Sequence, residues 1–242
     1  MNCYNDTSIR NEHFPYLNVE GTMDFKKTFE FLKKLSRNNN REWFEKNKPT
    51  YLSIKGEFEN FVGDVLHEMI PHDPSLEGLD PLKLTFRIYR DIRFSKDKTP
   101  YKTFLSAGMS SAGKGTGVPG YYFQIEPGNK SMIASGLYLP SAENLAKIRQ
   151  EIDYNGESFN ALVSEKKFKR TFGRLWDEDK LKTMPKGYPK DHPYIEYLKL
   201  KSFLVMHSFK DEDVLNRNFI KKLVESMKVA KPLNDFLNEA LG

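Results

Sequence analysis

The spacing of apolar residues is helical at first, becomes strand-like about a third of the way along the chain, and later returns to helical. Residues 24–36 and 49–69 carry apolar side chains three and four positions apart, which places them on one side of an α-helix. Between these stretches, Asn39 and Glu42 have the spacing of a capping box that opens a short helix through Trp43. The sequence therefore predicts three helices in its N-terminal third.

Apolar and polar side chains then alternate, which is the pattern of strands with one buried side. The alternation is clearest over residues 82–94. Three further strands are expected at 103–110, 120–126 and 131–139, and residues 127–130, Pro-Gly-Asn-Lys, suit a hairpin loop between the last two. Because the connections are short, we expect an antiparallel sheet.

Helical spacing returns in three stretches, at residues 141–154, about 159–163, and 215–227. Residues 184–193 are rich in Pro, Gly and Lys and predict a loop, whereas residues 194–209 are mixed in character. Pro232 is expected to separate the late helix from a short terminal one.

These patterns predict an α+β fold in which an antiparallel β-sheet, at about residues 82–139, is flanked by N-terminal and C-terminal helices. The chain shows no internal repeat and no linker long enough to divide it. We therefore expect a single domain over residues 23–242. Residues 1–22 lack periodicity and are expected to form a poorly ordered N-terminal arm.

Composition supports a globular protein and excludes several classes. Of the 242 residues, 38% are hydrophobic and 29% charged, and 18 Phe with 12 Tyr allow a sizeable core. No stretch approaches the roughly 20 apolar residues of a membrane span, and the N-terminus lacks the apolar run of a secretory signal. The single cysteine, Cys3, cannot form an internal disulfide. We therefore expect a cytoplasmic protein without membrane association; the oligomeric state stays open.

Positive charge is concentrated in one segment. The net charge of the chain is +5, and residues 87–102 alone hold six basic and two acidic side chains, a net charge of +4. Such a local cluster suits a phosphate, a carboxylate or an acidic partner better than a general coating of nucleic acid.

Three motifs resemble known sites but fail in detail. Residues 108–114 nearly match a P-loop, but Gly115 stands where Mg²⁺ binding needs Ser or Thr, and no helix can begin there. Ser95 and Lys98 match the Ser-x-x-Lys pattern of penicillin-recognising enzymes, but they follow a strand instead of lying on a helix. His67 and His72 are one residue too far apart for a zinc-binding helix. We expect neither a metal nor a cofactor.

The basic segment itself is the better candidate. Arg90 falls on the apolar side of its predicted strand, and a buried guanidinium needs a carboxylate or an anionic ligand. The structural alternative is an ion pair with Asp91, Asp97 or a distant acid. Arg87 and Arg93 fall on the other side, where the alternative is a solvated sheet face.

We interpret this segment, with help from two residues elsewhere, as a binding site for a phosphate or carboxylate. The candidate residues are Trp43, Arg87, Arg90, Asp91, Arg93, Ser95, Lys96, Asp97, Lys98, Tyr101, Lys102 and Lys201. Asp91 or Asp97 could act as a general base if burial raised its pKa, so an enzymatic role stays open.

Two other functions fit the same segment. One is a nucleic-acid-binding module in which Tyr101, Tyr121 and Tyr122 stack on bases, although the charge elsewhere is nearly balanced. The other is a non-catalytic protein-interaction domain in which the charged segment forms a structural network of ion pairs.

Four stretches of the chain resemble a known family. They are RDIRFSKDKTPYK, NNNREWFEKNKPTY, GLYLP and PKDHPYIEYLKLKSF. Together they resemble a conserved family of unknown function, number 2461, over roughly residues 25–227. The resemblance implies a bacterial or fungal cytosolic protein of one domain, and it assigns no catalytic residue. The family-like positions are Asn40, Trp43, Phe44, Arg90, Asp91, Arg93, Phe94, Lys96, Asp97, Lys98, Pro100, Tyr101, Lys102, Gly136, Tyr138, Asp191, His192, Pro193 and Lys201.

Overall fold

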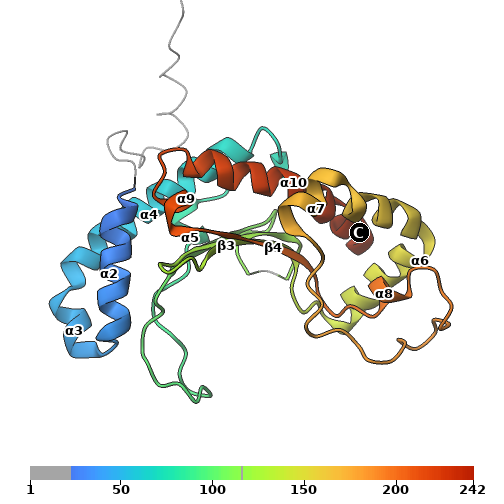
Figure 1. Ribbon diagram of the computed structural model, residues 1–242, viewed down its shortest axis with the longest axis horizontal. Helices are drawn as coiled ribbons and strands as arrows, with labels where there is room; N and C mark the ends of the chain where they lie inside the picture. Colours follow the sequence, from blue (N-terminus) through green and yellow to red (C-terminus); the bar gives the residue numbers. More distant parts are fainter. Residues whose placement is uncertain (1–22, 116) are drawn as a thin grey trace, which may run out of the picture.

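The computed structural model describes residues 23–115 and 117–242, and it has the predicted α+β fold. A four-stranded antiparallel sheet, in the order β1-β2-β3-β4, lies at the centre with helices on one face and at both ends (Figure 1). The poorly ordered arm expected at residues 1–22 lies outside the described residues. None of the helices in the described part of the chain has the length and apolarity that a membrane span requires.

The sheet is a meander for its first three strands, as predicted. The strands are β1 (Leu105–Met109), β2 (Gly120–Ile125), β3 (Ser131–Leu137) and β4 (Phe203–Phe209). β2 and β3 are joined by the predicted hairpin loop, in which the N–H groups of Gly128 and Asn129 donate to the carboxylate of Asp211 at 3.0 and 2.8 Å. The strand register places Gly108, Tyr122, Ala134 and Met206 side by side across the sheet.

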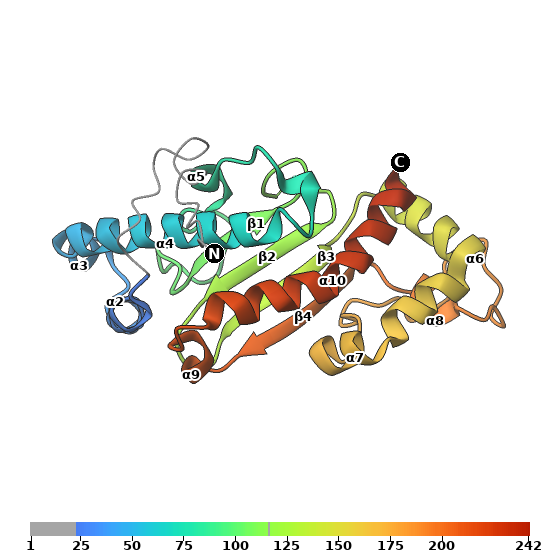
Figure 2. The ribbon, with the colours of Figure 1, turned by 90° about the horizontal axis from the view of Figure 1, so that it is seen from above.

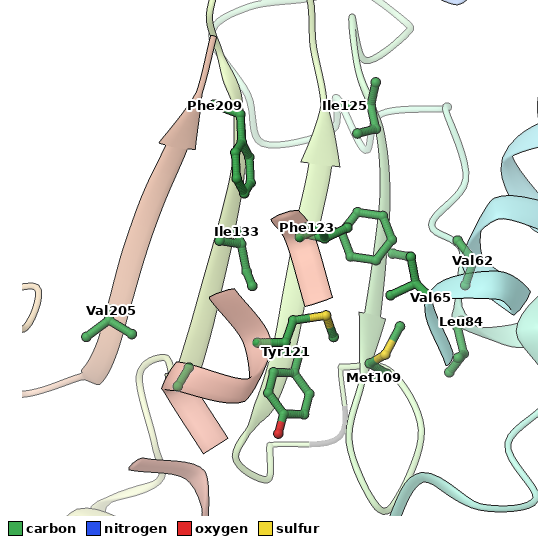
Figure 3. Close-up of a cluster of buried hydrophobic side chains, with 14 of the residues drawn as sticks. Val62, Val65, Leu84, Met109, Tyr121, Phe123, Ile125, Ile133, Val205 and Phe209 are labelled. Atoms are coloured by element: carbon green, nitrogen blue, oxygen red, sulfur yellow. The ribbon is translucent and has the colours of Figure 1, made fainter. Parts of the chain in front are cut away.

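One face of the sheet carries the core. Alternate residues of β2 and β3 are buried, among them Phe123, Ile125 and Ile133. Figures 1 and 2 show α4 (Lys48–Met69) and α10 (Phe219–Leu241) lying across this face. Figure 3 shows Phe123 and Tyr121 of β2 in this core beside Val65 of α4. The opposite side of the sheet, called the open face below, carries Ser106, Gly108, Gly120, Tyr122, Gln124, Met132, Ala134, Gly136, Leu204, Met206 and Ser208.

The predicted N-terminal helices are present as α2 (Phe25–Arg37), α3 (Arg41–Lys46) and α4. The predicted cap of α3 was one residue off: the side chain of Asn40, not Asn39, accepts from the Trp43 N–H at 2.9 Å. Asn39 instead bonds through its amide to both the backbone N–H and the backbone carbonyl of Tyr101. Each of the three consecutive asparagines is a suitable N-cap residue. Because Asn39 is engaged with Tyr101, Asn40 caps the helix.

The strand predicted at residues 82–94 is wrong. After a short 3₁₀ helix, η1 (Pro74–Leu76), a helical turn, α5 (Pro81–Leu84), occupies the start of this region, with Asp80 capping it. Only Thr85 and Tyr89 then make isolated bridges, to Ala107 and Tyr101. Residues 85–104 form a two-legged excursion, called the arm below. The alternation of apolar and polar residues gave a wrong prediction because the apolar residues are not all buried. Phe94, for example, is 95% exposed.

The C-terminal half differs from the prediction in three places. α6 (Ala142–Ser164) joins the two predicted helices across a kink at Asn155, and it is followed by α7 (Lys166–Phe172). The mixed stretch at residues 194–209 contains both α8 (Ile195–Leu198) and β4. β4 pairs along its whole length with β3, a partner more than 60 residues away in sequence. Local pattern alone could not show that pairing.

Pro232 does not end the last helix. After α9 (Asp211–Val214), α10 runs through Pro232 to Leu241. Ala230 and Leu233, on either side of the proline, are fully buried, while the proline itself faces solvent. Burial of the helix on the sheet therefore outweighs the hydrogen bond that proline cannot donate.

Candidate anion-binding site on the open face

The arm projects from the sheet on the side opposite α4 and α10 (Figure 1). Its two legs are joined by hydrogen bonds from Arg90 N–H to the Pro100 carbonyl, 2.9 Å, and from Lys102 N–H to the Ile88 carbonyl, 2.8 Å. The Tyr101 ring is buried and stacks on Phe44 of α3, with ring centres 4.0 Å apart. α3 thus fixes the base of the arm, and Tyr101 is an anchor instead of a ligand contact.

Arg90 is engaged by a carboxylate of the arm. Its guanidinium donates to Asp97 and to the hydroxyl of Thr99. Asp97 also accepts from the backbone N–H of Thr99 at 2.9 Å. This N–H, then Arg90, and then the Thr99 hydroxyl lower the pKa of Asp97 to about 2. Arg90 therefore forms an ion pair with Asp97, which is the structural alternative to ligand binding that the sequence analysis gave for Arg90.

Arg93 is paired in the same way, with Asp91. Its Nε and Nη2 atoms donate to the two oxygens of Asp91 at 3.0 and 2.7 Å, a bidentate pair near the arm's tip. These bonds from Arg93 lower the pKa of Asp91. A general base would have needed a raised pKa, so the direction at Asp91 and at Asp97 is the opposite of the one required.

The rest of the arm's tip is exposed and makes few contacts. Lys96 is exposed, and Lys98 donates to the Ile92 carbonyl at 3.0 Å. Ser95 and Lys98 lie in irregular backbone, so the pair is not on a helix. The tip therefore presents no assembled site.

At the base of the arm, two lysine ammonium groups lie over one aromatic ring, and Arg87 acts on one of them. The Nζ atoms of Lys102 and Lys114 lie 5.4 and 5.3 Å from the centre of the Phe86 ring. Burial, then Arg87, then Lys114 lower the pKa of Lys102. Burial also lowers the pKa of Lys114, whose Nζ donates to the Thr85 carbonyl. Arg87, Lys102 and Lys114 are called the cation cluster below.

No member of the cation cluster has a carboxylate within ion-pair distance among the described residues. Arg90 and Arg93 of the same arm, by contrast, form ion pairs with Asp97 and Asp91. Besides burial, Arg87 and Lys114 lower the pKa of Lys102, and besides Arg93, Arg87 helps to lower the pKa of Asp91. The cluster is therefore a local excess of positive charge that an anion would satisfy.

Two cavities border this cluster. One, of about 460 Å³, lies at the base of the arm and is bordered by Arg90, Lys102 and Phe104. The other, of about 350 Å³ and called the hollow below, lies on the open face. Phe86 borders the hollow and both lysines lie over its ring, so this ring links the cluster to the hollow, although none of the three cations lines it.

Two predicted site residues lie elsewhere. Trp43 of α3 packs on Phe31 of α2, with ring centres 5.8 Å apart. Lys201 follows α8, which lies at the opposite end of the molecule from α3 (Figure 1). The structure therefore brings together Arg87 and Lys102, and it does not bring Trp43 or Lys201 to them.

The sequence missed Lys114 and Phe86 as site residues, and it named Tyr122 only as a stacking surface for bases. Lys114 is the last residue of the stretch that nearly matched a P-loop, and that lysine was the one relevant signal in it. The stretch is indeed a connection between strands, β1 and β2. Within residues 23–115 and 117–242, no three His, Cys, Asp or Glu side chains group as metal ligands.

The tyrosines expected to stack on bases differ in exposure. Tyr101 and Tyr121 are each 3% exposed, and the Tyr121 hydroxyl donates to the buried Asp73 at 2.8 Å. Tyr122 lies on the open face beside Phe86, with ring centres 6.0 Å apart. Only Tyr122 of the three offers a surface to a ligand.

The family model of a conserved hypothetical protein (DUF2461) matches residues 27–236, so the chain belongs to this family. No curated protein and no solved structure matches the chain.

Proposed function

We propose that this member of the family binds a small ligand through a phosphate or carboxylate group, at the cation cluster on the open face. The observation that carries the proposal is that Lys102 and Lys114 share the Phe86 ring, that Arg87 acts on Lys102, and that none of the three has an acid of the described residues within ion-pair distance. Bringing like charges together raises the free energy of the folded protein. A bound anion would remove that penalty and gain charge-assisted hydrogen bonds.

The three side chains supply complementary contacts. Arg87 offers a planar guanidinium suited to two oxygens of one anion, whereas each lysine is a compact donor. Lys102 is half-buried with its ammonium group over the rings of Phe86 and Phe104, which limits its freedom before a ligand binds. A partly dehydrated ammonium group also interacts more strongly with an anion than one in bulk water does.

The arm supports this site through its own ion pairs. Arg90 with Asp97, and Arg93 with Asp91, are satisfied within the arm, as the protein-interaction alternative expects for structural residues. The Arg90–Asp97 pair joins the two legs from which Arg87 and Lys102 project, whereas the Arg93–Asp91 pair lies within one leg. The proposal is therefore narrower than the whole basic segment, and it adds Lys114 from outside it.

The test is a calorimetric titration with inorganic phosphate at low ionic strength, because salt screens exposed charges. The double variant Arg87→Gln/Lys114→Met should weaken binding by more than about tenfold, since charge-assisted hydrogen bonds contribute roughly 1.5–3 kcal/mol each. The matched control, Lys96→Met/Lys98→Met, removes the same charge from the tip of the arm. If both double variants bind equally well, or if the wild-type protein binds no phosphate, the proposal is wrong.

A further inference from the structure

We infer that the anion at the cation cluster is the phosphate of a nucleotide unit whose base lies in the hollow. This inference rests on the proposed function and extends it to the class of ligand. It draws on the shape of the hollow, the rings around it and the charge of the cation cluster.

The floor of the hollow is made largely of small residues. Gly108, Gly120, Ala134 and Gly136 line it around Tyr122, and the register sets them on neighbouring strands of the open face. A Cβ atom on Gly136 would lie 2.1 Å from the Phe203 carbonyl oxygen. One on Gly120 would lie 2.5 Å from that of Met109. Larger residues are thus excluded at these two positions by the sheet itself.

Aromatic side chains border this floor. Phe86 and Tyr122 are neighbours and are half-buried. Tyr138 also lines the hollow and is 62% exposed, and its ring lies 5.7 Å from that of Trp176. Aromatic faces around a floor of small residues suit a planar ring, which can stack on them. The hollow, about 350 Å³, falls within the usual range for small-ligand sites.

A row of polar groups follows β2, and its first member, Tyr122, lines the hollow. The Tyr122 hydroxyl donates to the Gln124 side-chain oxygen at 3.0 Å, and the Gln124 amide nitrogen donates to Glu126 at 3.0 Å. The Tyr122 hydroxyl is the group of this row that we expect to bond to the polar edge of a base.

The charge of the cluster favours phosphate over carboxylate. The cluster carries three cations, and two of their ammonium groups lie over the ring of Phe86, which lines the hollow. A phosphate monoester carries close to two negative charges and three acceptor oxygens, whereas a carboxylate carries one charge and two. A base joined to a phosphate therefore matches both the rings and the cluster.

The experiment compares four ligands on the wild-type protein in low salt: inorganic phosphate, ribose 5-phosphate, adenosine 5′-monophosphate and uridine 5′-monophosphate. We expect at least one mononucleotide to bind about tenfold more tightly than ribose 5-phosphate. Equal affinities would overturn this inference while leaving the proposed function intact. If none of the four binds, both are wrong.

A substitution tests whether the base of the nucleotide lies in the hollow. Tyr122→Leu should remove most of the preference for the mononucleotide while leaving phosphate affinity within about twofold. The matched control is Tyr154→Leu, which alters a tyrosine of α6 that is 75% exposed. If Tyr122→Leu keeps the full preference, the base does not lie in the hollow and the inference is wrong. The comparison of ligands on the wild-type protein decides the matter if this variant fails to fold.

A further comparison distinguishes the two sources of such a nucleotide unit, a free nucleotide and single-stranded nucleic acid. A 5′-phosphorylated hexathymidylate that binds more tightly than its mononucleotide would indicate single-stranded nucleic acid. A mononucleotide that binds as well or better would indicate a free nucleotide. Either result supports the inference, provided that binding exceeds that of ribose 5-phosphate.

Discussion

The substitution Lys102→Met separates an anion site from a structural ion pair. Lys102 stands at the centre of the cation cluster, and methionine keeps most of its length and apolar stem without the charge. If Lys102 served the fold through a buried carboxylate, its loss would cost about 3–5 kcal/mol in free energy of unfolding. If Lys102 instead binds an anion, its loss should change the stability of the ligand-free protein little.

The expected change can be worked from the positions of the two lysines. Because each Nζ lies just over 5 Å from the centre of the Phe86 ring, the two are at most about 11 Å apart. Two unit charges at that distance repel by about 0.4 kcal/mol in water and about 1.5 kcal/mol at an effective dielectric constant of 20. Against this gain stand cation–π contacts with Phe86 and Phe104, about 0.5–1 kcal/mol each. The sum lies between a gain of about 0.5 and a loss of about 1.6 kcal/mol.

Ligand-dependent stability should change far more. For a dissociation constant of about 1 mM, 20 mM phosphate stabilises the wild-type protein by about 1.8 kcal/mol. For a chain of this length that raises the Tm by roughly 4–7 °C. A tenfold loss of affinity in Lys102→Met would reduce the stabilisation to about 0.7 kcal/mol.

The assay is thermal unfolding with and without phosphate, with Lys96→Met as the control for loss of one charge. The control should keep the phosphate-dependent shift in Tm. The reasoning is refuted if Lys102→Met loses more than about 3 kcal/mol without phosphate, or if its phosphate-dependent shift equals that of the wild-type protein.

Three further predictions concern the arm and the core. The carboxyl of Asp97 should titrate by NMR near pH 2, and in Arg90→Gln its pKa should rise toward the ordinary 3.8. The stabilisation it gives the arm is thus present above about pH 4 and lost as the pH falls toward 2. Tyr121→Phe should lower the free energy of unfolding by about 1–3 kcal/mol in urea, because it removes a donor to the buried Asp73. Gly136→Ala should cost more than about 3 kcal/mol, since its φ of 120° and the nearby carbonyl both oppose a Cβ atom.

Each of these three predictions can be contradicted by a specific result, and the two stability predictions have a control variant. An Asp97 pKa near 3.8 in the wild-type protein would contradict the contacts of the arm. Tyr122→Phe, on the open face, should change stability by less than about 0.5 kcal/mol, and an equal loss from both tyrosine variants would contradict the core assignment. Gly128→Ala, where a Cβ atom meets nothing within 4 Å, should cost only about 1 kcal/mol. A loss there as large as at Gly136 would contradict the steric argument.

Local pattern predicted the parts of the fold whose partners are near in sequence. α2, α4 and the hairpin of β2 and β3 follow directly from periodicity and turn residues. β4 was missed because its partner strand lies far away in the chain. Residues 82–94 were wrongly assigned to a strand because alternation describes side-chain character and not burial, and Phe94 stays in solvent.

The candidate site was predicted in part, for a similar reason. The density of charge along the sequence identified the segment that holds Arg87 and Lys102. It could not show that Arg90 and Arg93 form ion pairs with acids of the same arm. Lys114 reaches the cluster only because β1 returns beside Thr85. The hollow depends on four residues from three strands, and no linear motif contains them.

The central claim is that the cation cluster, and not the paired arginines of the arm, binds the anion. The most direct measurement is the anomalous difference density of a crystal soaked in selenate, a phosphate-like anion whose selenium can be located. The account predicts a peak within hydrogen-bonding reach of Lys102 and Lys114, reduced in Arg87→Gln crystals. A peak at Arg90 or Arg93 with none at Lys102 would contradict it.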